Sequence, residues 1–310
     1  MAGPAFRGAP VHVRVPATSA NLGPGFDCLG LALGIHDELI ARIGEDGVVV
    51  DVAGEDAEDV ARDESNLVIE AMRATFTEFG GQPRGIELSC ANRIPHSRGL
   101  GSSAAAIVAG VLLARSLVLQ GERLLPDAAA LDLAARLEGH PDNVAACLSG
   151  GLTVAWTPAA VPHRPAVGVR NVRLEVDPSV VPVVFVPPGR SSTSSARGAL
   201  PSTVPHDDAA FNAGRAALLV AALTGRPELL FDATEDRLHQ TYRREVFPPS
   251  WELVGGLRSE GVAAVVSGAG PTVLALASGA PAATALLARA PEGWAAQVVT
   301  IDTDGAHVVR

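Results

Sequence analysis

Apolar and polar residues follow two different periods along the chain, and these periods predict interleaved strands and helices. Val11, Val13 and Val15 alternate with polar residues, which is the pattern of a strand with one buried face. From Asn66 to Phe79 the apolar residues recur every three or four positions, which indicates a helix that ends at Gly80. By the same reasoning, further strands are expected over 39–43, 48–52, 86–91, 152–156, 180–186, 262–266, 272–277 and 296–301, and further helices over 102–120, 126–138, 207–223, 227–239, 250–259 and 282–289.

The stretch between residues 157 and 179 contains several prolines and little periodicity, and it predicts a domain boundary. We therefore expect an N-terminal domain over 1–165 and a C-terminal domain over 166–310. Strands and helices are interleaved in both halves, which predicts an α+β fold with two domains. Long loops are expected over 17–30 and over 189–198, where glycine, proline, serine and threonine are frequent.

The amino-acid composition excludes more reaction mechanisms than the net charge does. The chain of 310 residues contains no lysine, so all 24 basic residues are arginine. This excludes mechanisms that form a Schiff base on a lysine, and it excludes P-loop NTPases with a Walker A lysine. The net charge of −10 argues against a nucleic-acid-binding protein. An apolar fraction of 47% predicts a globular core rather than a disordered chain.

The spacing of the cysteines and the length of the apolar runs indicate the cellular compartment of the protein. Cys28, Cys90 and Cys147 are widely spaced and form no CxxC pattern, so we expect neither a disulfide framework nor a zinc site. Residues 1–10 lack the pattern of a signal peptide, and the longest apolar run, 104–114, is too short to span a bilayer. We therefore expect a cytoplasmic protein that does not interact with membranes.

The glycine-rich segment Pro95–Ala104 runs directly into the most apolar helix pattern and is the strongest candidate for chemistry. Gly99 and Gly101 allow the backbone to approach a ligand closely, and the free amides of a first helical turn attract anions. A triphosphate therefore fits here without a lysine, and Ser102 and Ser103 offer hydroxyls for phosphate and Mg²⁺. One alternative is a flexible loop closed by a serine N-cap. A dinucleotide-binding fingerprint is disfavoured, because seven residues separate it from the preceding strand.

Four further clusters combine polar and turn-forming residues: 16–27, 138–143, 191–197 together with Arg243, and 265–272. The first suits a small polar ligand, and the second contains a carboxylate that could coordinate Mg²⁺. The arginines suit bidentate capture of a carboxylate, and the glycines of the fourth cluster allow close approach to a phosphate or substrate. Each cluster also has a plain structural alternative, namely Asx turns, a solvated helix–helix turn, surface arginines and a hairpin.

Together these segments resemble the motifs of the GHMP kinases, a family named for galactokinase, homoserine kinase, mevalonate kinase and phosphomevalonate kinase. Pro95–Ala105 is similar to the central motif of the family, and Ser267–Thr272 is similar to its C-terminal glycine-rich motif. The segments most similar to the branch that phosphorylates homoserine are Pro16–Asp27, Glu138–Ala145, Thr193–Arg197 and His239–Arg243. The matches run in family order from residue 11 to about residue 277, so they span nearly the whole chain.

The resemblance implies an N-terminal domain like ribosomal protein S5 domain 2 and a ferredoxin-like C-terminal domain. It also implies ATP-dependent phosphorylation of the hydroxyl of L-homoserine, on the route to threonine. ATP and Mg²⁺ are then the expected cofactors, and homoserine is the expected small-molecule partner. The family is often dimeric, which is compatible with a homodimer.

Carried over by position, the resemblance assigns the site residues. ATP would be bound by Asn66, Pro95, His96, Ser97, Arg98, Gly99, Leu100, Gly101, Ser102 and Ser103. The amino-acid substrate would be bound by Asn21, Asp27, His140, Thr193, Arg197, Arg243 and Gly268. Ser103, or alternatively Ser102, would hold Mg²⁺ together with Glu138, and Ser103 and Glu138 would lie with Asn143 at the reacting centre. Asp142 and Asn143 are interpreted as positioning residues, and no general base is assigned, because homoserine kinases are thought to leave proton removal to the phosphate.

Two other functions stay open from the sequence. One is a GHMP kinase that acts on another carboxylate-bearing alcohol, such as mevalonate or shikimate. Asp27 favours an amino acid instead, since it would pair with an α-amine. The other is a non-catalytic ligand sensor on the same fold. Glu138 and Ser103 count against a sensor, because a sensor does not need to hold Mg²⁺.

Overall fold

A long antiparallel pair, β1 (Val11–Ala20) and β2 (Leu29–Gly44), forms the centre of the first sheet. The computed structural model describes residues 3–159, 168–190 and 193–309. Within these ranges the sheet has seven strands in the order β11-β1-β2-β4-β3, and β5 pairs with β2 and with β6. The remaining strands are β3 (Gly47–Gly54), β4 (Gly85–Asn92), β5 (Leu152–Trp156), β6 (Arg170–Leu174) and β11 (His307–Val308).

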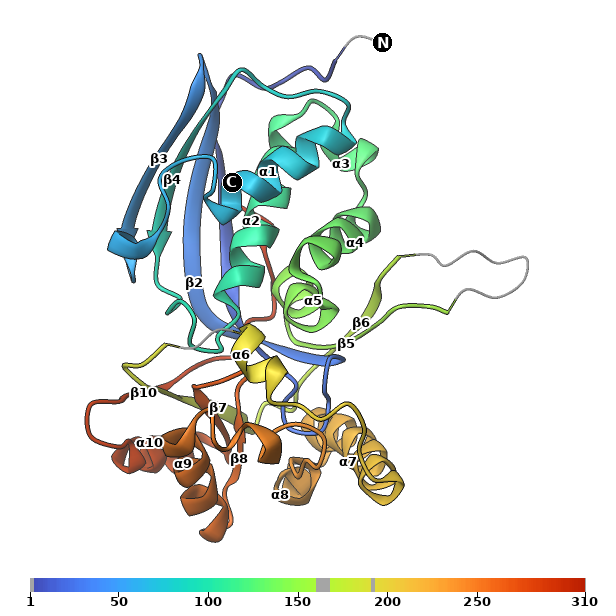
Figure 1. Cartoon of the computed structure of the whole chain (residues 1–310), viewed down its shortest axis with the longest axis vertical. Helices are drawn as coiled ribbons and strands as arrows, with labels where there is room; N and C mark the ends of the chain where they lie inside the picture. Colours follow the sequence, from blue (N-terminus) through green and yellow to red (C-terminus); the bar gives the residue numbers. More distant parts are fainter. Residues whose placement is uncertain (1–2, 160–167, 191–192, 310) are drawn as a thin grey trace.

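The helices of the first unit cover one face of this sheet (Figure 1). They are α1 (Leu67–Glu78), α2 (Ser102–Leu117), α3 (Gly121–Leu124), α4 (Asp127–Glu138) and α5 (Pro141–Ser149), with the short 3₁₀ turn η1 (Ala57–Asp59) on the way to α1. Most side chains of α2 are buried, since this helix is apolar on nearly every side. It forms the centre of the core, and its N-terminus points toward the second unit (Figure 1).

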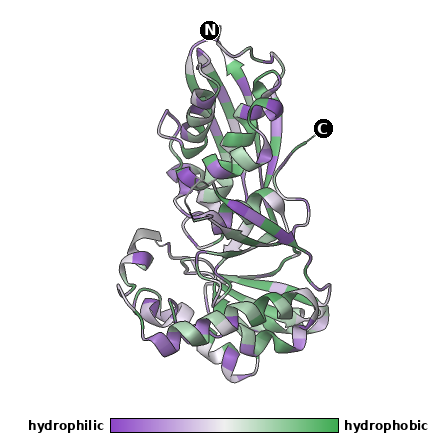
Figure 2. Ribbon diagram, turned by 90° about the vertical axis from the view of Figure 1, so that its right-hand side faces the viewer, coloured by the Kyte–Doolittle hydropathy of each residue, from purple (hydrophilic) through white to green (hydrophobic). Residues whose placement is uncertain are grey.

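The second unit is built on an antiparallel sheet of four strands in the order β10-β7-β9-β8. These strands are β7 (Val180–Val186), β8 (Ala263–Val266), β9 (Val273–Ser278) and β10 (Ala295–Val298). The helices are α6 (Thr193–Gly198), α7 (His206–Gly225), α8 (Leu230–Ala233), α9 (Pro248–Ser259) and α10 (Ala280–Leu286), with 3₁₀ turns η2 (Pro227–Leu229), η3 (Thr241–Arg243) and η4 (Leu287–Arg289). Figure 2 shows hydrophobic residues concentrated on this sheet and on the helices packed against it.

The α+β class is confirmed, with two layered units stacked along the long axis of the molecule (Figure 1). The division at residue 165 stays a prediction. Two strands beyond it, β6 and β11, pair with β5 and β1 and so belong to the first sheet.

The prediction for the first strands and the loop between them was wrong in its limits. β1 continues through Pro16 to Ala20, and β2 begins at Leu29, so the loop covers only 21–28. The pairing shifts register between Pro16 and Ala17, and such a bulge accommodates a proline inside a strand.

The predicted helix over 227–239 was correct for 227–233, which form η2 and α8, and wrong for the residues after them. The helical structure ends at Ala233, and the next residues turn around Asp236, whose carboxylate accepts hydrogen bonds from the amides of Leu238, His239 and Gln240. Conversely, the predicted loop over 189–198 contains α6, the irregular stretch 157–179 contains β6, and the turn expected after Glu138 leads directly into α5.

Candidate active site

The phosphate loop, which we define as Pro95–Ser103, connects β4 to the N-terminus of α2. Gly101 is the N-cap of α2 with φ of 70°, and no side chain caps the helix. The alternative of a serine N-cap is therefore wrong. Gly101, Ser102 and Ser103 line a cavity, so the amides of the first helical turn border this cavity without a side-chain acceptor. This arrangement favours an anionic ligand.

Both glycines of the loop are required by close packing. A Cβ atom at Gly101 would lie 1.9 Å from Oγ1 of Thr18, which is on β1. A Cβ atom at Gly99 would lie 2.5 Å from the carbonyl oxygen of Ser267, which follows β8. The phosphate loop is therefore pressed between a strand of each unit, and its backbone has little freedom to move.

The loop between β1 and β2 holds one wall of the same cavity. Asn21 and Asp27 both adopt left-handed conformations, with φ of 67° and 54°, which Asn and Asp tolerate better than most residues. The side-chain amide of Asn21 donates to the carbonyl oxygen of Gly268 at 2.9 Å, and its oxygen accepts from the Asp27 amide at 3.0 Å. The Asn21 side chain thus orders this loop through bonds to residues six and 247 positions away, which are not the Asx turn of the structural alternative, and Asp27 reaches the cavity.

Two arginines of the second unit face the cavity. Arg197, on α6, forms an ion pair with Asp27 through two contacts of 2.8 and 3.2 Å. Arg243 is only 3% exposed and donates to the carbonyl oxygens of Ala196 (3.1 Å) and Gly268 (3.3 Å). Among the described residues, no carboxylate forms an ion pair with Arg243. A buried guanidinium without an anionic partner is costly, so this position favours an anionic ligand.

Phe26 and His239 support the arginine pair. The guanidinium carbon atoms of Arg197 and Arg243 lie 5.6 and 5.7 Å from the centroid of the Phe26 ring. The ring of Phe26 stacks on that of His239, which is fully buried and contacts Arg243 Nη1 at 3.1 Å. The aromatic ring therefore attracts both guanidinium groups.

The turn from α4 to α5 supplies the opposite wall. Glu138 ends α4, and its carboxylate accepts a hydrogen bond from Ser103 Oγ at 2.7 Å. Asn143 accepts a hydrogen bond from Thr18 Oγ1 at 2.8 Å, which fixes its amide beside the phosphate loop. Asp142 is buried and accepts from the Asn143 amide at 2.7 Å. The solvated turn that was the alternative here is instead a packed corner of the cavity.

The ionisable groups of this wall are shifted by burial. Burial raises the pKa of Asp142 to about 7; the hydrogen bond from the Asn143 amide opposes this, and the nearby carboxylates Asp27 and Glu138 add to it. Burial also raises the pKa of Glu138, partly offset by the Ser103 hydrogen bond. The pKa of His140 is lowered by burial and then by the charge of Arg197, so this imidazole is neutral at pH 7.

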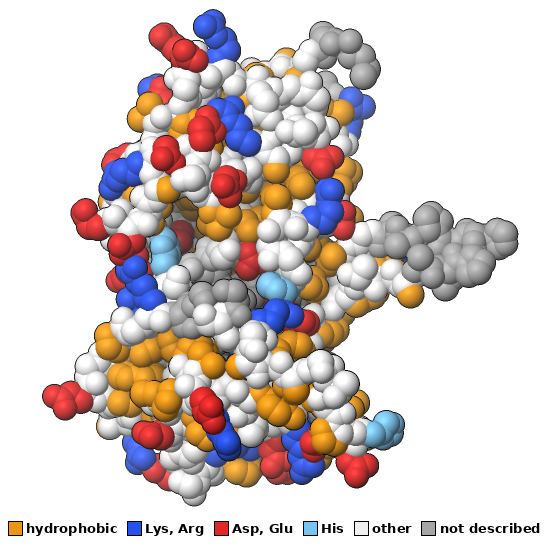
Figure 3. All heavy atoms as spheres, viewed as in Figure 1, with side chains coloured by type: hydrophobic (Ala, Val, Ile, Leu, Met, Phe, Trp, Pro, Cys, Tyr) orange, Lys and Arg blue, Asp and Glu red, His pale blue; other side chains and the backbone are white. Residues whose placement is uncertain are grey.

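Residues from the phosphate loop, the β1–β2 loop, the α4–α5 turn and the second unit line one cavity of about 300 Å³ where the two units meet. Charged and histidine side chains gather at this junction in the space-filling view (Figure 3). Of the residues predicted for substrate, catalysis or metal, those that line it are Asn21, Asp27, Ser103, Glu138, His140, Asn143, Arg197, Arg243 and Gly268. Thr193 is the first residue of α6, and its side chain lies outside the described part of the structure.

A second cavity of about 310 Å³ shares Ser97, Ser102 and Ser103 with the first. Asn66 and His96 also line it, and the two cavities adjoin along the phosphate loop. Asn66 uses its side chain within the protein, however, since it caps α1 by accepting from the amides of residues 68 and 69. Of the residues predicted to bind ATP, Pro95, Arg98 and Leu100 line neither cavity.

Asp37 is a residue of the site that the sequence analysis missed. It lies on β2, is buried, and accepts hydrogen bonds from the amides of Arg93 (2.6 Å) and Ile94 (2.9 Å) at the start of the phosphate loop. An acidic residue at a buried position of a strand is the signal that could have found it. Ser267 was quoted only as part of a motif, yet its hydroxyl donates to the Gly99 carbonyl at 2.6 Å.

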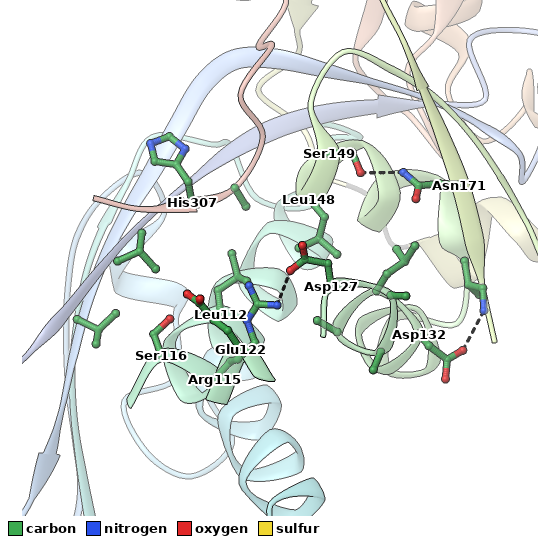
Figure 4. A pocket seen from close by; sticks show the side chains of 18 of the residues that line it. Leu112, Arg115, Ser116, Glu122, Asp127, Asp132, Leu148, Ser149, Asn171 and His307 are labelled. Carbon is green, nitrogen blue, oxygen red and sulfur yellow. Dashed lines mark hydrogen bonds and ion pairs between the residues drawn. The ribbon is translucent and has the colours of Figure 1, made fainter. Parts of the chain in front are cut away.

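The largest cavity of the described residues lies elsewhere, between α2, α4, β6 and β11, with a volume of about 1500 Å³. Figure 4 shows its interior, where Arg115 pairs with Asp127 at 2.6 Å. None of the predicted site residues lines it. Size alone therefore does not indicate the functional site in this molecule.

Residues 66–151 match the description GHMP kinases N terminal domain, and residues 217–296 match GHMP kinases C terminal. A homoserine kinase of Streptomyces coelicolor is 57% identical over 309 residues, covering 100% of this chain and 97% of that protein. The chain belongs to the GHMP kinase family. A homoserine kinase of Streptomyces avermitilis is 56% identical over 309 residues, with 100% and 99% of the two chains covered. The crystal structure of a homoserine kinase from Cytophaga hutchinsonii, at 27% identity, superposes on all of both chains with a TM-score of 0.81.

Each of the six motif segments contributes at least one residue to the lining of the first cavity. The match to both domain descriptions agrees with the two units of the fold. In the parts of the chain that the structure describes, no helix has the length and apolar character needed to cross a bilayer.

Proposed function

We propose that this chain transfers the γ-phosphoryl group of ATP to the hydroxyl of L-homoserine, giving ADP and O-phospho-L-homoserine. The identity to the Streptomyces homoserine kinases supports this reaction. So does the motif order along the chain. Location in the cytoplasm and assembly as a homodimer stay predictions.

The single observation that carries the choice of substrate is the buried, carboxylate-free guanidinium of Arg243. It faces the same cavity as the N-terminus of α2. A substrate carboxylate on Arg243 and a phosphate on the helix amides would then be held within one small space. Asp27, opposite Arg197, offers the negative charge that an α-ammonium group needs. An amino acid with a hydroxyl therefore matches the charges of the cavity better than a plain carboxylic acid does.

The nucleotide is proposed to extend along both cavities. The triphosphate would lie against the amides of the phosphate loop, and the adenosine would lie in the second cavity, which Asn66 borders. Phosphoryl transfer depends mainly on positioning and on charge neutralisation, and the rigid glycine backbone suits this task. Without lysine, the charge of the phosphates would be neutralised by main-chain amides and a divalent cation.

Ser103 and Glu138 are proposed to hold Mg²⁺. Their oxygens are hard donors 2.7 Å apart, and Mg²⁺ prefers one or two carboxylates plus phosphate oxygens to a cage built by protein alone. When bound, the ion would stabilise charge on the phosphates.

The other residues of the cavity are proposed to orient the alcohol. Neutral His140 and charged Asp27 would border the substrate amine, and the Asn143 amide, fixed by Thr18, would direct the hydroxyl toward the phosphate. The Asp142 carboxylate would hold Asn143 in place by accepting a hydrogen bond from the main-chain amide of Asn143. No group is assigned as general base, so the hydroxyl proton would pass to the transferred phosphate.

A panel of alcohols in an assay for ADP release tests this proposal. The panel contains L-homoserine, mevalonate and shikimate, each with ATP and Mg²⁺. We expect ADP release with homoserine and little with the other two. Turnover of mevalonate or shikimate but not homoserine would replace the substrate, and binding of ATP and homoserine without any ADP release would indicate a sensor.

A further inference from the structure

A cluster of four charged residues contains Asp56, Arg98 and Arg190, which lie outside the lining of both cavities, and Asp59, which pairs with Arg190 at 2.6 Å and lines the second cavity. Asp56 immediately precedes η1 in the left-handed conformation, and its side chain is only 9% exposed. Its carboxylate accepts from the His96 amide at 2.9 Å, from Arg98 Nη1 at 2.8 Å and from Arg190 Nη2. One carboxylate thus joins two residues of the phosphate loop to an arginine of the second unit.

Arg98 makes the second link between the units. Its Nε donates to the carbonyl oxygen of Pro187 at 3.2 Å, and Nη2 donates to that of Pro188 at 3.4 Å. Both prolines directly follow β7 of the second unit. Arg98 was expected to contact ATP, but its guanidinium is occupied by Asp56 and by these carbonyls. Its main chain serves the loop as well, since its carbonyl oxygen accepts from the Thr272 amide at 3.0 Å.

The position of Asp56 connects this cluster to the nucleotide site. The turn that it starts ends at Asp59, and Asp59, Val60 and Ala61 line the second cavity. An exposed ion pair typically contributes under about 1 kcal/mol, which would make the cluster unimportant. Here the carboxylate is nearly buried and accepts three donors, and a group in that situation holds its partners firmly.

We propose that Asp56 is a positioning residue, which sets the phosphate loop for ATP and holds the second unit where its arginines face that loop. The proposal rests on the proposed kinase function for its substrate, but its nucleotide part does not depend on which alcohol is used. Burial would raise the pKa of Asp56, but the bonds from His96, Arg190 and Arg98 outweigh it and hold the pKa below its usual value. Asp56 is therefore charged at neutral pH.

The test compares Asp56→Asn with the full-length wild type. Asparagine keeps the shape, tolerates the left-handed conformation and can still accept from the His96 amide, but it removes the charge. We expect the Kd of a nonhydrolysable ATP analogue, measured by calorimetry, to rise by about tenfold, and kcat to fall by about tenfold or more. Asp51→Asn is the matched control, because its carboxylate is 81% exposed and pairs with Arg62 at 3.4 Å away from the loop. It should change neither value.

A double variant separates positioning from a general loss of stability. If Asp56 acts through Arg98, Asp56→Asn combined with Arg98→Gln should bind the ATP analogue within about threefold of the weaker single variant. If the increase in Kd of the double variant equals the product of the two single increases, Asp56 does not act through Arg98. If Asp56→Asn has the Kd and kcat of the wild type, the proposal itself is wrong. Thermal unfolding checks that each variant is folded; if Asp56→Asn is not, Arg98→Gln against Arg62→Gln gives the same comparison. A wild type that binds no ATP would instead defeat the proposed function.

Discussion

Arg243 illustrates how a single residue can define a ligand. Its guanidinium is buried, and three of its contacts are neutral groups, namely two main-chain carbonyls and the ring of His239. Burial lowers its pKa, and the charge of Arg197 lowers it further, although an arginine stays protonated. The carboxylates of Asp27, Asp236 and Asp142 oppose this shift in pKa from a distance, but none of them forms an ion pair with Arg243, so a ligand carboxylate would be its first direct anionic partner.

Replacement of Arg243 by leucine should weaken homoserine capture. A charge-assisted hydrogen bond contributes roughly 1.5–3 kcal/mol, so we expect KM for homoserine to rise about 10–100-fold with little change in KM for ATP. Steady-state kinetics with each substrate varied in turn measures both values. Arg244→Leu is the control, since the neighbouring Arg244 is exposed. An unchanged homoserine KM in Arg243→Leu would contradict the assignment.

Glu138→Gln should weaken the binding of Mg²⁺ rather than the binding of homoserine. The amide keeps the size of the side chain but is a much weaker ligand for Mg²⁺ than a carboxylate. We expect kcat to fall by about tenfold or more at limiting Mg²⁺ and to recover partly as Mg²⁺ is raised. A titration of activity against Mg²⁺ measures this, with Glu122→Gln as a control on α3. Wild-type turnover at limiting Mg²⁺ would exclude the metal role.

The pKa of Asp142 predicts how stability depends on pH. Because burial raises it from 3.8 to about 7, the folded protein keeps a proton that the unfolded chain has already lost between these pH values. The free energy of unfolding therefore falls as pH rises through this window, by at most about 1.4 kcal/mol per pH unit, and the effect levels off above it.

Asp142→Asn should remove this dependence. Its stability relative to wild type, from urea unfolding without ligands, is expected to rise between pH 5 and pH 7 and then stay constant. Asp51→Asn, an exposed carboxylate, should show no such trend. A constant difference across the window would mean that Asp142 is already ionised in the folded protein at pH 5.

For single residues, the sequence predicted which side chains lie at the same cavity better than it predicted the interaction partner of each side chain. Polar residues among glycines indicated Asn21 and Asp27, the suitability of arginine for binding a carboxylate indicated Arg243, and the structure brings all three to one cavity. The partner of a side chain depends on residues far away in the chain, and no local pattern reports it. For this reason Arg98 was expected at the phosphates, whereas its guanidinium is bound by Asp56.

At the scale of elements, the phosphate loop and α2 act as one unit. The loop is fixed at Gly101 by Thr18 and at Gly99 by Ser267, so the helix amides present a preformed surface. Preformed amides need no rearrangement when a phosphate binds, which is how electrostatic stabilisation becomes effective in a site.

Gly101→Ala should disrupt this surface. The added Cβ would lie 1.9 Å from Thr18 Oγ1 at a φ of 70°, so the loop has to move. A shift of about 1 Å at such a site can reduce activity about 100-fold, and we expect a loss of that order in kcat/KM for ATP. Gly256→Ala, in α9 with no atom within 4 Å of the new Cβ, should leave kinetics unchanged. Equal kinetics for both variants would contradict a rigid loop.

The elements that the sequence predicted well are those with a strong period of their own. α2 is apolar throughout and α1 has regular apolar spacing that ends at Gly80, so both were expected close to their observed limits. The predicted helix over 227–239 failed after residue 233 because the side chain of Asp236 competes for the backbone amides, and this competition overrides helical spacing. β6 was missed because it is short and largely exposed, which leaves no apolar pattern.

At the scale of the whole molecule, the chain returns from the second unit to the first. β11 pairs with β1, the Asp302 carboxylate contacts His36 Nε2 on β2 at 2.6 Å, and the Ala306 amide donates to the Cys147 carbonyl on α5. The first sheet thus includes residues that lie almost 300 positions apart, as in Val13 and Val308. A domain boundary at residue 165 would assign β11 to the second domain, although β11 pairs with β1 in the first sheet.

Gly305→Ala tests the stability that this return provides. A Cβ at Gly305 would lie 2.5 Å from the Leu148 carbonyl, so the segment has to leave α5, and we expect a loss of about 2–4 kcal/mol in the free energy of unfolding. Gly293→Ala has a similar φ of 78° but no atom within 4 Å, and should lose only about 1 kcal/mol from backbone strain. Urea unfolding of both measures the difference, and equal losses would mean that the docked segment contributes nothing.

The pairing of β11 with β1 also affects how the molecule is made. During synthesis β1 leaves the ribosome among the earliest segments, while its partner emerges some 290 residues later, which at about 5–20 residues per second is a delay of roughly 15–60 seconds. Throughout that time the outer edge of β1 is open to other strands in the cell. Until translation has passed residue 308, Val13 and Arg14 on this edge therefore lack the partner strand that they have in the folded protein.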